Sequence, residues 1–305
     1  MNPILLSPKI DFVFKALFGQ EQNKPLLLSL LNAVLDRVDG KKMVEIELLN
    51  TELGKSLEGR KSPRLDLLAK DKEGRFFHVE MQAQSHNLFL ERMLYYWARL
   101  FSNQLESGQE YKTLTPVISI LFTDFVAVPE LSDYYTCWMW KEVEHETILS
   151  DYGQIHIIEF PKFEESWDEA NDLLEQWVFF LNEVDQMQYE PLPVWADDRL
   201  REAYKELERL SQKPELRALY EAQLDEIRLY RTLLSDSYEE GHEEGYADGR
   251  KEGRKEGREE GREEGKEEGR LEVVRQLLEQ GLALEMVAKV SGYTLEQLEA
   301  LTQDT

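Results

Sequence analysis

Residues 64–82 limit the folds open to this chain more than any other stretch. They read RLDLLAKDKEGRFFHVEMQ, two apolar runs joined by a turn that contains Gly74. Residues 72–74 have the composition of a three-residue hairpin loop with Gly74 in the left-handed conformation. A hairpin closed by that loop has one register, in which Asp66 lies directly opposite Glu80. The sequence thus predicts two carboxylates side by side on neighbouring strands.

The two faces of this hairpin differ in polarity. One face is wholly apolar and carries Leu65, Leu67, Ala69, Phe77, Val79 and Met81. Strand side chains alternate between faces, so burial of the apolar face sends both carboxylates to the other one. Like charges directly opposite each other cost about 0.2–1 kcal/mol, whereas a hard divalent cation needs such oxygen ligands. The alternative is a solvated polar face on which Arg64 neutralises Asp66.

The elements around the hairpin indicate the fold class. Apolar periodicity and turn residues predict helices at residues 7–19, 25–38 and 87–108, and strands at 43–50, 115–125 and 153–163. A helix placed between strands favours an α/β or α+β domain in which helices flank a sheet. We therefore expect one domain over residues 1–165.

Two helical segments are expected after this domain. Residues 166–235 have the apolar spacing of a helical extension, and residues 236–270 form a charged arm in which glycine recurs every fourth residue from Gly241 to Gly269. On a helix this spacing makes a slowly rotating stripe that lets two backbones approach closely. We therefore expect a helical arm that forms a homo-oligomer. A disordered linker is the alternative, because each Gly disfavours a helix by about 1 kcal/mol.

Residues 271–305 resemble a small helix-turn-helix. The second helix, TLEQLEALTQD, contains three acidic residues and no basic one. A helix that lies between DNA phosphates needs cations instead. We therefore expect this tail to serve packing or oligomerisation rather than the reading of DNA sequence.

The charge of the chain is unevenly distributed. In total, 36 Lys and Arg face 61 Asp and Glu, giving a net charge of −25, which disfavours nucleic acid over most of the surface. The region around the hairpin is locally basic, with Lys55, Arg60, Lys61, Arg64, Lys70, Lys72 and Arg75. DNA is expected to approach there. With Cys137 as the only cysteine and no apolar run near about 18 residues, we expect a cytoplasmic protein without a membrane span.

Three blocks of sequence carry a family resemblance. SPKIDFVFKALFG, RLDLLAKDKEGRFFHVEMQ and FLERMLYYWARLFSNQLESGQEYKTLTPVISI follow one another in order. Over roughly residues 7–165 the chain resembles the recombination-promoting nuclease or transposase family of the PD-(D/E)XK nuclease superfamily. The glycine-every-four arm and the terminal helix pair are also typical of its members. The resemblance implies an α/β, restriction-endonuclease-like core with a mixed central sheet flanked by helices, plus a helical C-terminal extension.

The resemblance also implies a metal site. Asp66, Glu80 and the backbone carbonyl of Met81 would hold Mg²⁺, or alternatively Ca²⁺ or Mn²⁺. Gln82 stands where the superfamily usually has Lys, which orients or activates the attacking water. Gln can only form hydrogen bonds, so this departure puts the rate and the metal preference in question, although Gln is common here within the family.

Two residues of the first predicted helix extend this site. Asp11 matches an acidic residue of the family, and Lys15 lies one helical turn later on the same face, where it can supply the missing cation. The alternative for Asp11 is a first-turn carboxylate that favours the helix dipole. His78 shares the predicted face of Glu80 and is either an extra base or, more simply, a hydrogen-bonded strand histidine.

These residues together predict a metal-dependent DNA endonuclease that hydrolyses phosphodiester bonds with little sequence specificity. Its role would be DNA processing in recombination, mobile elements or defence. Arg64, Arg92 and Arg99 are the expected phosphate contacts. One alternative is a weak or inactive nuclease-like scaffold that acts through self-association and partner binding. A cut-and-paste transposase is a third hypothesis, for which the sequence shows no triad of widely separated acidic residues.

Overall fold

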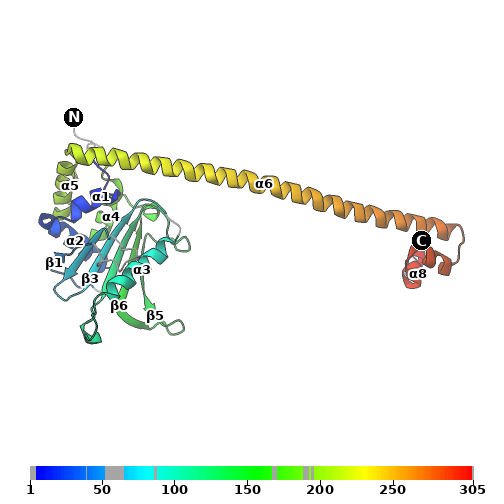
Figure 1. The fold of residues 1–305 in the computed structure, drawn as a ribbon, viewed down its shortest axis with the longest axis horizontal. Helices are drawn as coiled ribbons and strands as arrows, with labels where there is room; N and C mark the ends of the chain where they lie inside the picture. Colours follow the sequence, from blue (N-terminus) through cyan, green and yellow to red (C-terminus); the bar gives the residue numbers. More distant parts are fainter. Residues whose placement is uncertain are drawn as a thin grey trace. The chain divides into compact units, whose positions relative to one another are not determined.

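The computed structural model describes residues 5–38, 40–51, 65–85, 88–166, 170–187, 192–193 and 196–303. The chain divides into two compact units, residues 1–227 and residues 228–305. The first unit contains the sheet and the helices packed around it (Figure 1). It includes residues 166–227, for which the sequence predicts a separate extension, and the four-part division of the chain stays a prediction.

A six-stranded mixed sheet forms the centre of the first unit. Its strands are β1 (Ile46–Leu48), β2 (Leu67–Asp71), β3 (Phe76–Gln82), β4 (Val117–Thr123), β5 (Tyr135–Lys141) and β6 (Ile148–Glu159). The strand order is β1-β2-β3-β4-β6-β5. β3, β4 and β6 run parallel, while β1 and β2, β2 and β3, and β5 and β6 pair antiparallel. This mixed sheet flanked by helices confirms the predicted α/β fold class.

The β2–β3 hairpin has the register expected from its loop. Leu67 pairs with Val79 and Leu68 with His78. Gly74 adopts a φ of +87°, the left-handed conformation that glycine enters without a side-chain clash. β2 begins only at Leu67, so Asp66 lies one residue before the strand, at a bend in the chain.

Both faces of the hairpin are buried. The predicted core face, which includes Leu67, Phe77 and Val79, packs into the main hydrophobic core. Residues of α3 (Phe89–Ser102) pack on the other face, where Leu100 contacts the cluster of Leu68 and the Tyr96 ring lies 6.0 Å from His78, which is fully buried. The alternative of a solvated polar face therefore does not hold at His78, because a strand that has a parallel neighbour is usually covered on both sides.

Leu65 is a second departure from the expected faces. It packs with Leu68 under α3 instead of sharing the face of Leu67. The bend at Asp66 interrupts the strict alternation of an extended strand, so the residue before it turns to the opposite side. Asp66 is thereby separated from the regular ladder of β2.

Helices from both ends of the first unit cover the main core. They are α1 (Asp11–Phe18), α2 (Lys24–Leu35), α4 (Leu173–Glu183), α5 (Asp198–Ser211) and the first turns of α6 (Pro214–Glu279). α1 buries four apolar residues at helical spacing, and Trp177 of α4 is also fully buried. Leu216, Tyr220 and Leu224 place one stripe of α6 against the same core. This packing brings α1 and α6 to the end of the sheet where Asp66 lies.

The glycine-rich arm is helical in the structure. α6 runs without a break to Glu279 and contains all eight glycines of the repeat. A Cβ atom at any of these glycines would meet no other atom within 4 Å. α7 (Leu284–Ser291) and α8 (Leu295–Gln303) follow, and Val274, Val287 and Leu298 form a small buried cluster. Self-association of the arm stays a prediction.

Candidate metal centre

Asp66 and Glu80 are linked by reciprocal hydrogen bonds to backbone amides. The amide of Asp66 donates to Glu80 Oε2 at 3.2 Å, and the amide of Met81 donates to Asp66 Oδ2 at 2.9 Å. These bonds take the place of the regular backbone hydrogen bonds that would join β2 to β3 if β2 began before Leu67. Each carboxylate is thus held against the strand of the other, and both are more than 90% buried.

The backbone of Met81 faces the same two carboxylates. Its amide points to Asp66, and in an extended strand the carbonyl of a residue points to the same side as its amide. The carbonyl of the next residue, Gln82, accepts from Asp124 on the opposite side, as this alternation requires. The Met81 carbonyl is therefore directed to the side of β3 on which Asp66 lies.

A buried histidine fixes the orientation of Glu80. His78 Nε2 lies 3.0 Å from Glu80 Oε2, and His78 Nδ1 lies 3.4 Å from the Ser119 hydroxyl. A neutral imidazole that donates from Nε2 and accepts from Ser119 satisfies both contacts. Glu80 Oε2 then has two donors, and Oε1 forms no hydrogen bond within the described part of the chain. The simple reading of His78, a hydrogen-bonded strand histidine, matches this geometry.

Lys15 joins α1 to the carboxylate pair. Its ammonium lies 2.5 Å from Asp11 Oδ1 and 2.8 Å from Asp66 Oδ1. Burial opposes the charge of Lys15, but its hydrogen bonds to Asp11 and Asp66 outweigh burial and raise the pKa of Lys15. Asp11, Lys15 and Asp66 are therefore brought together, with the ammonium between the two acids.

Asp66 has an unusual affinity for protons. Burial first, and then the negative charges of Glu80 and Asp11, raise the pKa of Asp66 to about 7, while Lys15 acts in the opposite direction. One ammonium is thus not enough to compensate the carboxylates around Asp66. A site with this excess of negative charge favours binding of a further cation.

The carboxylates open into a cavity of about 430 Å³. The predicted residues in its lining are Asp11, Lys15, Asp66, Glu80, Met81, Gln82 and Arg92. Tyr96 of α3 also lines it, and burial raises the pKa of its hydroxyl. Sequence reasoning missed the contribution of α6, which adds Gln223, Glu226 and Ile227. The signal was the apolar stripe of α6, but that stripe alone does not say against which strand end the helix packs.

The three predicted phosphate contacts have different positions. Arg92 lines the cavity and donates from Nη2 to Gln82 Oε1 at 2.6 Å. Arg99 lies two turns later on α3, outside the cavity lining, and its Nε is buried and forms no hydrogen bond with a described residue. Arg64, like the basic residues Lys55, Arg60 and Lys61, lies outside the described residues.

Comparison with known proteins assigns the family. A family model described as PD-(D/E)XK nuclease family transposase matches residues 8–234. The chain belongs to this family. The match confirms the resemblance found in the sequence and supports a nuclease-like or transposase-like role. No curated protein and no solved structure matches the chain significantly.

The donor set of this PD-(D/E)XK protein fits a hard divalent cation. Nucleases of this superfamily usually use such ions, and Asp66, Glu80 and the Met81 carbonyl supply only oxygen. Glu80 Oε1 is free of hydrogen bonds from described residues, and burial together with the negative charges of Glu80 and Asp11 raises the pKa of Asp66. The same oxygens would not suit a softer metal that prefers sulfur or nitrogen ligands.

A group outside this cavity has the spacing of metal ligands. Among the described residues, Glu142, Glu144 and His145 place three donor atoms within 4.8 Å of one another. All three are exposed in the β5–β6 turn, and the Glu142 carboxylate accepts from the amides of Glu144 and His145. These hydrogen bonds account for the cluster as part of the turn.

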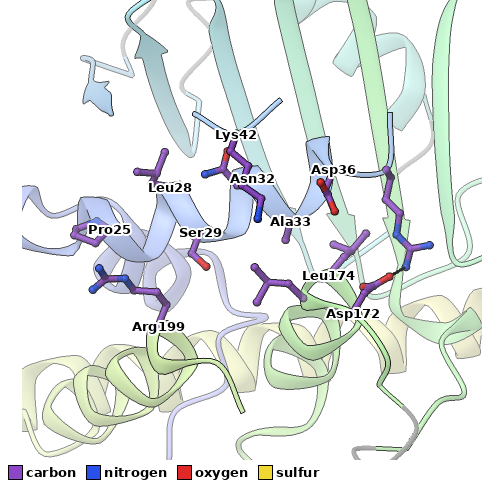
Figure 2. A pocket seen from close by; sticks show the side chains of 12 residues that line it. Pro25, Leu28, Ser29, Asn32, Ala33, Asp36, Lys42, Asp172, Leu174 and Arg199 are labelled. Carbon is purple, nitrogen blue, oxygen red and sulfur yellow. Dashed lines mark ion pairs between the residues drawn. The ribbon is translucent and has the colours of Figure 1, made fainter. Parts of the chain in front are cut away.

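A second cavity of about 320 Å³ lies between α2, α4 and α5 (Figure 2). Its most prominent polar group, Arg37, is engaged with Asp172 at 2.5 Å and Glu175 at 3.2 Å. Figure 2 also shows Ser29 and Asn32 of α2; Asn32 is bonded to the backbone of Met43. Asp36 and Asp172 also line this cavity, and the ion pair with Arg37 offsets the charge of Asp172. Across the described ranges, no helix is long and apolar enough to cross a membrane.

Proposed function

We propose that this PD-(D/E)XK protein is a metal-dependent DNA endonuclease that hydrolyses phosphodiester bonds with little sequence specificity. The observation that carries the proposal is the hydrogen-bonded pair of Asp66 and Glu80 in one cavity with the Met81 backbone. Two carboxylates held together in this way disfavour each other unless a cation lies between them. Family membership supports the class of reaction.

Asp66, Glu80 and the Met81 carbonyl would hold the ion, which is Mg²⁺ or alternatively Ca²⁺ or Mn²⁺. When bound, it would supply Lewis-acid chemistry by lowering the pKa of a water molecule and offsetting the charge of the phosphate. Among the described residues the lining contributes no thiolate and no imidazole, and the nearby His78 is fully buried and bonded to Glu80. Hard-ion chemistry is therefore what these residues support best.

The chain's own residues would then orient the reactants. In hydrolysis a bond forms between a water oxygen and phosphorus, the phosphorus–oxygen ester bond breaks, and the leaving oxygen receives a proton. Lys15 and Gln82 line the cavity beside the carboxylates and would position the water or the scissile phosphate. Arg92 and Arg99 would contact phosphates. Asp11 keeps Lys15 close to Asp66 through their ion pair.

The wider role rests on the family and on the C-terminal segments. We place the activity in DNA processing linked to recombination, mobile elements or defence, in the reducing cytoplasm that a single Cys137 favours. The glycine stripe of α6 would join copies of the chain into a homo-oligomer. Its glycines are exposed on a continuous helix, as close backbone approach requires.

A nuclease-like scaffold without activity is the second candidate. The feature that favours it is Gln82, an uncharged residue where the superfamily pattern has Lys. Such a scaffold would act through the helical arm and the small cluster formed by Val274, Val287 and Leu298. It would retain the fold and lose the ion or the cleavage reaction.

Cleavage of supercoiled plasmid separates the two candidates. The wild type should nick DNA with Mg²⁺ or Mn²⁺ and stop when EDTA is added. Asp66→Asn and Glu80→Gln keep the side-chain shapes but remove charge, and each should lower cleavage at least a hundredfold. Glu142→Gln removes a carboxylate from the exposed turn and should leave cleavage unchanged. Equal nicking by all four proteins would remove the proposed site.

A further inference from the structure

The end of β3 carries an uncharged residue beside the carboxylates. Gln82 lies two residues after Glu80 on the same strand, so its side chain occupies the same face of the sheet. It also lines the cavity. Whatever charge acts on a phosphate at this position must therefore come from another residue.

Arg92 is the charged residue bound to Gln82. Its Nη2 donates to Gln82 Oε1 at 2.6 Å, and guanidinium has only donors, so the amide oxygen has to face it. The Phe89 ring, three residues earlier on α3, lies 5.8 Å from the guanidinium carbon. Arg92 Nε is buried and forms no hydrogen bond with a described residue. Gln82 and Phe89 thus hold the guanidinium, whose one hydrogen bond to a described residue is the bond to Gln82.

The two cations among the described residues of the cavity lining differ in how they are compensated. Lys15 is bonded to two carboxylates, Asp11 and Asp66, which offset its charge. Arg92 is bonded to a neutral amide and forms no ion pair with a described residue. A guanidinium is always charged and matches phosphate oxygens through two parallel hydrogen bonds. Arg92 is therefore the cation of this cavity that is available to an anion.

We infer that Arg92 is a catalytic residue that binds the scissile phosphate and offsets its charge, and that Gln82 is the positioning residue that holds Arg92. This inference rests on the proposed nuclease function. It assigns to Arg92 the positive charge that the superfamily usually has in Lys at this place and that Gln82 lacks. Gln82 suits the task because a neutral acceptor orients the guanidinium and leaves its charge uncompensated. A carboxylate of the same shape would orient it equally well and neutralise it.

Gln82→Glu is the variant that tests this contrast between an amide and a carboxylate most directly. It should lower kcat at least tenfold, because an ion pair with Glu would replace the hydrogen bond with Gln. Arg92→Met should lower kcat about 10²–10³-fold, the usual loss when one donor to a charged transition state is removed. Arg92→Lys should retain more activity than Arg92→Met. In the Arg92→Met background, Gln82→Met should cause no further loss, since Gln82 acts through Arg92.

Ca²⁺ affinity distinguishes loss of the phosphate contact from a general disturbance of the site. A disturbed site would bind Ca²⁺ more weakly, whereas loss of the phosphate contact alone would not. Calorimetry with Ca²⁺ should give Arg92→Met and Arg92→Lys an affinity within threefold of the wild type, because Arg92 is not a proposed ligand. Arg209→Met is the matched control: Arg209 is an exposed arginine paired with Glu206 outside the cavity, and its loss should leave kcat unchanged. Thermal melting checks that the variants fold. Arg92→Met within threefold of the wild-type kcat would overturn the inference, as would a fall in Ca²⁺ affinity that matches the fall in kcat.

Failure of the proposed function gives a different result. If the wild type cleaves no DNA under any metal condition, the nuclease proposal fails. The role of Arg92 is then tested by its effect on the binding of a short DNA duplex in the presence of Ca²⁺. Fluorescence anisotropy measures that binding. Arg92→Met should weaken that binding at least fivefold relative to Arg209→Met. Equal binding by the two variants would overturn the inference as well.

Discussion

Lys15→Met should tighten metal binding, although Lys15 belongs to the proposed catalytic site. Asp66 Oδ2 is bonded to the Met81 amide, and Lys15 is 2.8 Å from the remaining oxygen, Oδ1. A divalent ion that binds Asp66 through Oδ1 has to displace the ammonium. The wild type therefore loses one ion pair whenever the metal binds, and the variant does not.

The size of the effect follows from that single contact. A hydrogen bond to a charged group contributes about 1.5–3 kcal/mol, and a factor of ten in affinity corresponds to about 1.4 kcal/mol. Lys15→Met should therefore bind Ca²⁺ about ten- to a hundredfold more tightly. Loss of the ammonium also raises the pKa of Asp66 further above about 7, so a proton competes with the ion. Measurement at about pH 8.5 keeps that competition small.

Isothermal calorimetry with Ca²⁺ tests this reasoning. Lys24→Met is the matched control, because Lys24 forms an ion pair of similar length with Glu21 on the surface. Its Ca²⁺ affinity should equal that of the wild type. Lys15→Met should show the higher affinity together with slower plasmid cleavage, which separates ion binding from positioning. Unchanged or weaker Ca²⁺ binding by Lys15→Met would refute the competition between ammonium and metal.

Three further predictions concern neighbouring residues. His78→Leu should weaken Ca²⁺ binding about 10–100-fold in calorimetry, because Glu80 loses the donor that orients it; an unaltered affinity would argue against that role. The raised pKa of Asp66 means that its contribution to stability is lost as the pH rises from about 4 to about 7. Without metal, the melting temperature should therefore rise more between pH 8 and pH 5 in the wild type than in Asp66→Asn. Gly74→Ala should destabilise the fold by about 1–2 kcal/mol in urea unfolding, because alanine is strained at a φ of +87°.

The hairpin shows what sequence reasoning can establish. Its loop sets the register and the apolar alternation selects the buried face, both of which are local properties of residues 64–82. The bend at Asp66 and the cover of α3 are not local. Leu65 changes sides and His78 is fully buried because of packing between elements distant in the chain. For that reason the sequence alone leaves a solvated polar face as an alternative.

The cavity wall shows where sequence reasoning ends. Asp11 and Lys15 could be proposed from helical spacing together with the family pattern. Gln223 and Glu226 could not be proposed from the sequence. The start of α6 has the pattern of an ordinary amphipathic helix, and that pattern does not indicate the strand end against which the helix packs. The contact of Arg92 with Gln82 is of the same kind. It depends on how α3 lies on the sheet, whereas sequence spacing only placed Arg92 on a stripe with Arg99.

The hydrogen-bond partners of Lys15 and Arg92 indicate that these two cations have different roles within one cavity. Lys15 is bonded to carboxylates, so under the proposed function it would have to move when a metal ion binds Asp66. Arg92 is bonded to an amide, so binding of that ion would leave its contact intact. A site in which both cations were bound to carboxylates would offer a phosphate no free positive charge. An uncharged residue at position 82 is therefore compatible with catalysis, because it leaves the charge of Arg92 available.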